Sequence, residues 1–225
     1  MMDAAPEPLI APLTRYSEIP ENEEASMDYT IRVATVADAR DMLAIYRPYV
    51  QETAITFEVE APPLEAFCER IELTLTKYPW IVAESAEEGI VGYAYAAPFK
   101  NRAAYDWSVE TSIYLRRDIR GRGLGRRLYE ELESLLALMG IRNLNACIAC
   151  TDRADDPYLT NGSVLFHEKM GYAIVGTFHD CGFKLGRWYS MLWMEKMIAP
   201  HDEAPQPIIP FPQLEQSAQQ PAAAR

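Results

Sequence analysis

The chain has 225 residues, of which 49% are hydrophobic, and a formal net charge of −12. This is enough apolar material for one folded domain, and an acidic chain without a basic stripe disfavours nucleic acid as a partner. The sequence shows neither a run of about 18 apolar residues, as a membrane span needs, nor the pattern of a secretory signal. We therefore expect a cytoplasmic protein that does not associate with membranes.

The two ends of the chain differ from its middle in composition. Residues 1–29 hold seven acidic residues against one arginine, which is half of the net charge, and they predict a disordered acidic arm. Residues 199–225 are rich in Pro, Gln and Ala without apolar periodicity, and they predict a disordered tail. The folded domain is expected over residues 30–198.

The first half of this domain alternates between strand and helix patterns. Apolar residues at helical spacing predict helices over 36–50 and from Pro62-Pro63 to Leu75, because proline is favoured where a helix begins. The strands are predicted over 29–34, 80–84 and 90–97, with a short extended stretch at 54–59 and a hairpin turn at Glu87-Glu88-Gly89.

The second half adds two helices and the remaining strands. An apolar stripe of leucines from Leu124 to Met139 predicts a long amphipathic helix, which Gly140 ends. The other predicted elements are strands over 108–115, 143–149, 172–178 and 188–197 and a helix over 163–170. The result is an α/β (α+β) domain with a mixed sheet of about seven strands and four helices.

The junction between strand 108–115 and the long helix carries the run Arg120-Gly121-Arg122-Gly123-Leu124-Gly125. Glycines leave backbone N–H groups unobstructed, and the start of a helix favours phosphate oxygens. A Walker loop would need Gly-Lys-Ser or Gly-Lys-Thr, and a dinucleotide fingerprint would need a third glycine where Arg126 stands. The pattern Arg-x-x-Gly-x-Gly instead resembles the pyrophosphate loop of the GNAT N-acetyltransferases, which bind acetyl-CoA.

Three further segments resemble the phosphinothricin and methionine sulfone type of these enzymes. They are Ala104 to Ser112 before the loop, Ser163 to Tyr172, and Gly182 to Tyr189 with its Gly-x-Lys-x-Gly-Arg-Trp pattern. The stretch Thr151 to Thr160 is longer than in the shortest members and shifts Asn161 relative to Ser163. The resemblance implies the GNAT acyl-CoA N-acyltransferase fold, with a mostly antiparallel sheet.

Two residues are candidates for catalysis. Aminolysis of a thioester needs a neutral amine, and a carboxylate can take the amine's proton. The resemblance places such a base at Glu110, whose alternative is a solvated strand residue. His167 stands where many GNAT enzymes carry a tyrosine near the sulfur, and it is expected either to transfer a proton or to be a helix histidine pinned by a carbonyl.

The resemblance also implies how the cofactor is held. The pantetheine arm is expected to add to the strand before the loop as an extra strand would, and the pyrophosphate to take main-chain N–H groups of the loop. The implied cofactor residues are Ile113, Tyr114, Leu115, Gly121, Arg122, Gly123, Leu124, Gly125, Arg126, Asn161 and Lys169.

The resemblance points to Arg102 and Tyr105, in the loop before strand 108–115, as part of the amino-acid site, and Phe57 is the third substrate residue expected. An arginine fork suits a carboxylate or phosphinate, and an aromatic ring can wall a small pocket, although Arg102 can also be a solvated loop residue. No metal is expected: Cys147 and Cys150 point to opposite faces of a strand, so they are interpreted as ordinary cysteines.

The predicted function is transfer of an acetyl group from acetyl-CoA to the α-amine of a small amino acid such as phosphinothricin, methionine sulfoximine or methionine sulfone. The alternatives are a GNAT enzyme for another amine, such as a polyamine or a peptide N-terminus, and a CoA-binding module without turnover. A homodimer is expected through Gly186 to Tyr189, because this stretch resembles family segments near the subunit contact and exposed Trp and Tyr are frequent at interfaces.

Overall fold

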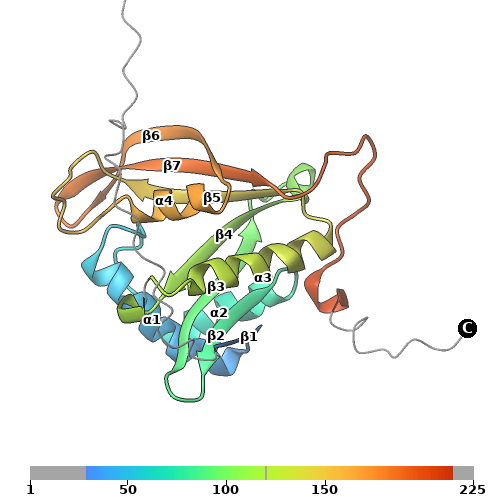
Figure 1. Ribbon diagram of the computed structural model, residues 1–225, viewed down its shortest axis with the longest axis horizontal. Coiled ribbons are helices and arrows are strands. Elements are labelled where there is room, and N and C mark those ends of the chain that lie inside the picture. The colour runs from blue at the N-terminus through green and yellow to red at the C-terminus, as the bar shows by residue number, and fades with distance from the viewer. Residues whose placement is uncertain (1–28, 120, 215–225) are drawn as a thin grey trace, which may run out of the picture.

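The computed structural model of the chain is built on one twisted sheet (Figure 1) and describes residues 29–119 and 121–214. The sheet has seven strands in the order β1-β2-β3-β4-β5-β7-β6. Neighbouring strands are antiparallel except β4 and β5, which run parallel. The mixed, mostly antiparallel sheet that the sequence predicts is confirmed, whereas the arm up to residue 28 lies outside the described residues.

The strands follow the predicted places closely in all but one case. They are β1 (Thr30–Val33), β2 (Trp80–Ser85), β3 (Gly89–Pro98), β4 (Ser108–Leu115), β5 (Asn143–Cys150), β6 (Ala173–Lys184) and β7 (Arg187–Met197). The predicted end of β6 at residue 178 is wrong, because the strand continues to Lys184. Its pairing with β7 shifts register between Phe178 and Gly182. The polar residues that end the apolar pattern lie within this irregular stretch of the strand.

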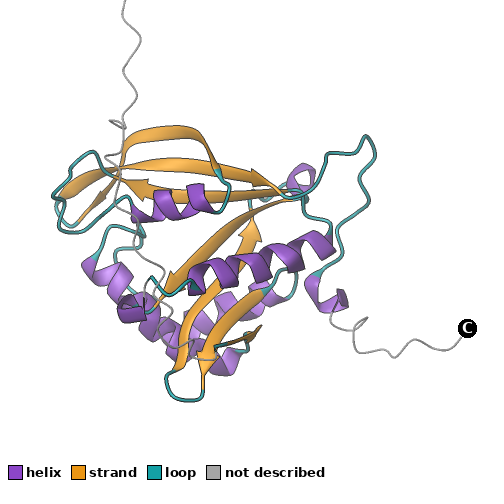
Figure 2. Ribbon diagram, viewed as in Figure 1, coloured by secondary structure: helices purple, strands orange, loops and turns teal. Residues whose placement is uncertain are grey.

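Four α-helices of the described chain cover the two faces of the sheet (Figure 2). They are α1 (Ala39–Glu52), α2 (Leu64–Leu75), α3 (Leu124–Met139) and α4 (Gly162–Lys169). Helices α1 and α2 share one core cluster with strand residues such as Trp80 and Tyr93, while α3 and α4 share another with the opposite face. None of the described helices is long and apolar enough to cross a membrane.

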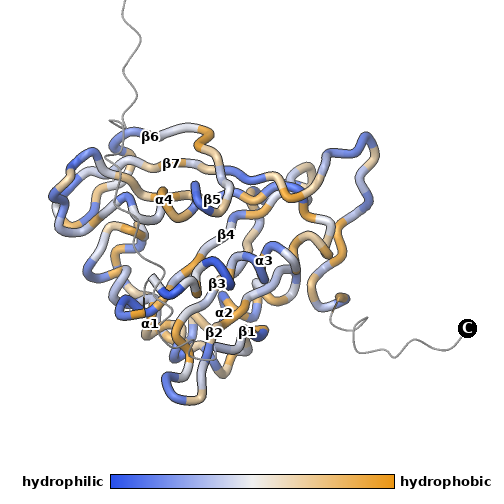
Figure 3. Tube along the Cα trace, viewed as in Figure 1, coloured by the Kyte–Doolittle hydropathy of each residue, from blue (hydrophilic) through white to orange (hydrophobic). Residues whose placement is uncertain are grey.

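Helix α3 shows how the sequence produces this packing. Leu128, Leu132 and Leu136 recur at four-residue spacing and are fully buried, so one face of the helix lies on the sheet. Gly123 before the helix and Gly140 after it both have positive φ, a conformation that costs a residue with a side chain free energy. Figure 3 shows hydrophilic residues gathered in exposed turns such as the one between β2 and β3.

The segment after β7 corrects one prediction. Residues 199–214 were expected to belong to a disordered tail, yet the backbone returns to the end of α3, where Ile209 N–H donates to Met139 O (2.9 Å). Phe211 is 2% exposed and belongs to the core cluster around α3. Because Phe211 is the single buried anchor of this segment, no periodic apolar pattern in the sequence indicated that the segment is folded. Residues 215–225 lie outside the described residues.

The parallel pair β4–β5 is the feature that forms the site. The two strands pair only from Ser108 to Glu110 on β4 and from Asn143 to Asn145 on β5. Beyond these residues they diverge, and each strand pairs only with its other neighbour, β3 or β7. The sheet therefore opens at its centre, with main-chain groups of both strands along the opening.

Candidate active site

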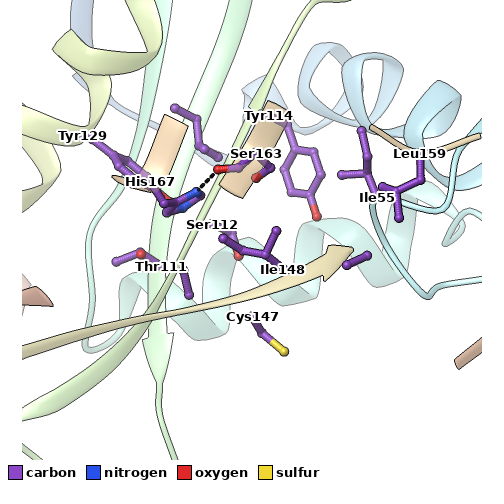
Figure 4. Close-up of a pocket in the computed structure, with 13 residues that line it drawn as sticks. Ile55, Thr111, Ser112, Tyr114, Tyr129, Cys147, Ile148, Leu159, Ser163 and His167 are labelled. Carbon is purple, nitrogen blue, oxygen red and sulfur yellow. Dashed lines mark hydrogen bonds between the residues drawn. The ribbon is translucent and has the colours of Figure 1, made fainter. Parts of the chain in front are cut away.

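A cavity of about 60 Å³ lies in the opening between β4 and β5 (Figure 4). Its walls are residues 111–114 of β4, residues 146–149 of β5, and side chains from α3, α4 and two loops. The loop and helix residues are Ile55, Tyr129, Leu159, Ser163 and His167. The cavity thus joins the two faces of the sheet: Tyr129 and His167 belong to the α3/α4 face, and Ile55 packs with the α1/α2 core.

Glu110 lies at the base of this opening, in the last β4 residue paired with β5. Its side chain is half-buried, and burial raises the pKa of its carboxyl group, while the positive charge of Lys100 acts in the opposite direction. Val109 is buried in the α3 core, so Glu110, the next residue along the strand, faces the α1/α2 side. A carboxylate with a raised pKa is suited to accept a proton near neutral pH.

His167 lies on the other face of the sheet and is almost fully buried. Its Nδ1 donates to the carbonyl oxygen of Ser163 (2.7 Å), since a carbonyl can only accept. In the neutral ring Nε2 is then an acceptor, and the hydroxyl of Tyr129 donates to it (3.0 Å). Burial lowers the pKa of His167, although the Ser163 carbonyl opposes this, so the ring is neutral at neutral pH.

The two catalytic candidates are therefore not in direct partnership. They occupy opposite faces of β4. The hydrogen bond from His167 to the carbonyl of Ser163 is also the arrangement that the sequence analysis gave as the alternative to proton transfer, a helix histidine pinned by a carbonyl. Tyr129, which the sequence analysis missed, lines the cavity beside His167 and is hydrogen-bonded to it. The available signal was a tyrosine in the buried stripe of α3, because a buried hydroxyl needs a partner.

Lys100 is the second residue that sequence reasoning missed. Its ammonium lies 4.6 Å from the ring centroid of Phe99 and 4.9 Å from that of Trp193. These rings hold a cation close enough to Glu110 to act on the pKa of its carboxyl group.

The glycine loop has the backbone that an anion site requires. Gly121 and Gly123 have φ of +85° and +73°, and a Cβ on either would meet no atom within 4 Å, so open space surrounds this backbone. Gly125 is buried, and a Cβ at this position would lie 3.3 Å from the ring of Phe166, so the glycine lets α3 and α4 approach each other. The loop fits a pyrophosphate bound through main-chain N–H groups.

The charged side chains of this loop have protein partners as well. The Nη1 atom of Arg122 donates to the hydroxyl of Tyr29 (3.3 Å), and Arg126 pairs with Glu130 across one helical turn (3.6 Å). Leu124 is buried in the core, so its side chain is not available to a ligand. Arg120 lies outside the described residues.

The other expected cofactor residues divide into two groups. Ile113 and Tyr114 line the cavity, while the carbonyl of Leu115 accepts a hydrogen bond from Tyr49 (2.6 Å). Asn161 precedes α4 and its side chain bonds both main-chain groups of Thr151, and Lys169 is exposed at the end of α4.

The expected substrate residues are spread over two regions. Arg102 and Tyr105 are exposed in the connection before β4, where Tyr105 packs on Phe99 at 5.8 Å between ring centroids. Phe57 instead lies in the α1–α2 loop, and its ring fills the space that a side chain on Gly182 of β6 would need. The structure does not bring these three residues into one cluster.

Cys147 lines the cavity as a protonated thiol. Burial, together with the negative charge of Glu110, raises its pKa to about 12, so the thiolate is not available at neutral pH. Within the described chain no group of three or more His, Cys, Asp or Glu residues is arranged to hold a metal ion.

Comparison with known proteins agrees with this geometry. A family model described as an acetyltransferase (GNAT) domain matches residues 31–193. The chain is 34% identical over 186 residues to a phosphinothricin N-acetyltransferase of Streptomyces viridochromogenes, covering 82% of this chain and 95% of that protein. It is 31% identical to an L-methionine sulfoximine/L-methionine sulfone acetyltransferase of Pseudomonas aeruginosa, covering 80% of this chain and all of that protein.

Among solved structures, a GNAT superfamily phosphinothricin acetyltransferase from Sinorhizobium meliloti in complex with AcCoA superposes with a TM-score of 0.70. It is 31% identical in sequence, and the match covers 81% of this chain and 98% of that one.

Proposed function

This chain belongs to the GNAT family of acetyl-CoA-dependent N-acetyltransferases, and on that premise we propose that its acceptor is the α-amine of a small amino acid. The acceptors that the related enzymes' names give, phosphinothricin and methionine sulfoximine or sulfone, share an amino-acid end and a compact polar side chain. The observation that carries the proposal is a half-buried carboxylate, Glu110, at the base of the opening between β4 and β5.

The charges on the acceptor face support an amino acid over a polyamine. Lys100 lies beside Glu110, and Lys184 is 3% exposed with its ammonium donating to the carbonyl of Thr56 (2.6 Å). The exposed ammonium of Lys100 can attract a carboxylate and repel a second ammonium group, whereas the buried ammonium of Lys184 is already bound to the Thr56 carbonyl.

In the proposed mechanism each group acts on its own face of the sheet. Bound acetyl-CoA supplies the thioester, which the glycine loop and the open edge of β4 would hold. Glu110 takes one proton from the attacking nitrogen, so that the nitrogen stays neutral while the C–N bond forms and the C–S bond breaks. The sulfur leaves as the CoA thiolate with the electrons of the C–S bond, and the proton that completes the thiol comes from solvent. We assign Tyr129 to this side, where its hydroxyl turns from Nε2 of His167 to donate a hydrogen bond to the thiolate, and His167 positions that hydroxyl.

The test is a panel of amines assayed by released thiol. It comprises L-phosphinothricin, L-methionine sulfoximine, L-methionine sulfone, spermidine and an alanine-terminated peptide, each with acetyl-CoA. The amino acids should be turned over, and Glu110→Gln should lower kcat by about 10²–10⁴-fold, as expected for loss of a general base. The deficit should shrink at high pH, where more of the amine is already neutral.

Two outcomes would contradict this proposal. Turnover of spermidine or the peptide alone would assign another acceptor, and near wild-type kcat in Glu110→Gln at neutral pH would place the base elsewhere. The KM for acetyl-CoA should change little in this variant, because the cofactor residues are on the loop and the strand backbone.

We also propose a homodimer through the β6–β7 ribbon. Phe178, Phe183 and Trp188 are each more than half exposed there, and β6 is the last strand of the sheet within the described residues. The rings of Phe183 and Trp188 pack on each other at 5.2 Å and form an exposed aromatic patch. Sedimentation should show a dimer at micromolar concentration and a shift towards monomer in Trp188→Glu; a wild-type monomer would refute the proposal.

A further inference from the structure

The loop between β5 and α4, residues 151–160, is folded around one buried carboxylate. The side chain of Asp156 has 0% exposure, although the residues around it in sequence are exposed. Its Oδ1 accepts the N–H groups of Tyr158 (2.9 Å) and Leu159 (3.0 Å) and the hydroxyl of Tyr189 (3.1 Å). Its Oδ2 accepts from Nη1 of Arg187 (3.1 Å). Four donors thus satisfy a charge that would otherwise be costly to bury.

These hydrogen bonds fix the position of Leu159. The neighbouring carbonyl of Tyr158 accepts the N–H of Ala54 (3.0 Å), which ties the loop to the end of α1. Leu159 is 4% exposed, packs with Ala54 and Tyr189, and lines the cavity opposite the helices. In Figure 4 it lies next to Ile55 at one end of the cavity, away from His167.

A second loop is held by the same end of the β6–β7 hairpin. Lys184 donates to the carbonyl of Thr56, next to Ile55, and Gly182 leaves room for the ring of Phe57. The hairpin residues therefore brace both loops that bring Ile55 and Leu159 to the cavity. These contacts give a physical role to three residues of the Gly-x-Lys-x-Gly-Arg pattern at 182–187. Gly182 leaves room for the ring of Phe57, Lys184 binds the carbonyl of Thr56, and Arg187 binds the carboxylate of Asp156.

We propose that Asp156 is a positioning residue for the acceptor amine. It makes no contact with the reacting atoms; it holds Leu159 where the wall of the cavity meets the α1/α2 face, the face on which Glu110 lies. This inference rests on the proposed function, because the acceptor is taken to approach from that face. Without the carboxylate, the N–H groups of Tyr158 and Leu159, the Tyr189 hydroxyl and the Arg187 guanidinium lose their acceptor, and the loop must move to rehydrate them.

Kinetics of the full-length chain with L-methionine sulfone and acetyl-CoA test the proposal. Asp156→Ala should lower kcat/KM for the amine by about 10- to 100-fold, because a small misplacement of the cavity wall at Leu159 disturbs how the acceptor is oriented. The KM for acetyl-CoA should change less than that for the amine, because the glycine loop and the backbone of β4 are untouched. Asp156→Asn, which keeps an oxygen for the two N–H groups, should recover most of the activity. The exposed neighbour Asp155 provides the matched control, and Asp155→Ala should behave as wild type.

Amide hydrogen exchange separates positioning from general stabilisation. In Asp156→Ala the amides of Tyr158 and Leu159 should exchange faster, while those of α3 keep their protection. A variant that unfolds at lower temperature but retains wild-type kcat/KM below that temperature would overturn the proposal. If Asp156→Ala does not fold, Asp156→Ser, whose shorter side chain cannot reach all four donors, takes its place in the same assays, and unchanged acceptor kinetics would overturn the proposal.

The two proposals can fail separately. If wild type acetylates no amino acid of the panel, the proposed acceptor is wrong, but loop exchange in Asp156→Ala still tests the positioning role. Equal exchange of Tyr158 and Leu159 in both proteins would then refute that role as well.

Discussion

The hydroxyl of Tyr129 and the imidazole of His167 meet at 3.0 Å although they are 38 residues apart in sequence. This contact makes them one unit, because the pinned Nδ1 leaves Nε2 as the acceptor for Tyr129. The hydrogen-bonded cluster extends further, since Tyr129 also has a hydrogen bond with the side chain of Thr111, whose hydroxyl lies 3.1 Å from that of Tyr172. A change to either member of the pair should therefore disturb the other.

A double-mutant cycle tests this unit. Tyr129→Phe and His167→Asn should each lower kcat by about 10- to 100-fold, and the double variant should lose little more than either single one. The exposed His179 is the control, and His179→Asn should leave kcat unchanged. Fully additive losses would show that the two residues act independently.

The positions of single residues were predicted from the sequence in part. The strand and loop placed Glu110 on β4, where the structure has it, and the helix pattern placed His167 on α4. The partners Tyr129 and Lys100 were missed because such contacts depend on how α3 and the connection before β4 pack in space. Asp156 was missed for a similar reason: in sequence it is one of several acidic residues in a loop, and only its burial distinguishes it.

At the scale of elements, the loop that begins α3 is a turn built on positive-φ glycines. Gly123 and Gly140 flank the same helix with φ of +73° and +90°, and a Cβ on either would meet no neighbouring atom. A valine at either position therefore costs similar conformational free energy, about 1–2 kcal/mol. Their roles differ, since only Gly123 belongs to the proposed pyrophosphate loop.

This matched pair isolates cofactor binding. Gly123→Val should raise the KM for acetyl-CoA at least tenfold or abolish binding, whereas Gly140→Val should lower stability to a similar degree and leave that KM unchanged. Calorimetric titration with CoA gives the affinity independently of turnover. Unchanged CoA affinity in a folded Gly123→Val protein would exclude the loop as the pyrophosphate site.

The elements themselves were largely readable from periodicity. Helix α3 follows its leucine stripe, and the glycines at its two ends mark both boundaries. Strand β6 was underestimated because its register shifts against β7 between Phe178 and Gly182, and an irregular pairing leaves no alternation in the sequence. The opening between β4 and β5 is also invisible in either strand alone, since it arises where the parallel pairing stops.

At the scale of the whole molecule, both ends of the described chain fasten to the domain. The hydroxyl of Tyr29 donates to Glu88 (2.6 Å), and its carbonyl accepts from Arg127 of α3 (2.8 Å). At the other end, Arg142 pairs with Asp202 (2.8 Å), and the indole of Trp107 donates to the carbonyl of Gln206 (2.8 Å). We propose a minimal domain of residues 29–214, which is longer than the 30–198 that composition predicts.

The buried ring of Phe211 gives this boundary a quantitative test. Phe211→Ala removes a fully buried aromatic ring from the cluster around α3 and should lower the free energy of unfolding by about 3–5 kcal/mol. Ile209 is 43% exposed two residues away, so Ile209→Ala should cost much less. Urea unfolding of the two variants beside wild type measures the difference.

A chain trimmed to 29–214 should keep wild-type stability and turnover, and one ending at 198 should lose stability as Phe211→Ala does, because both lack the same anchor. Equal stability of the chains ending at 198 and 214 would mean that the segment after β7 contributes nothing to the core.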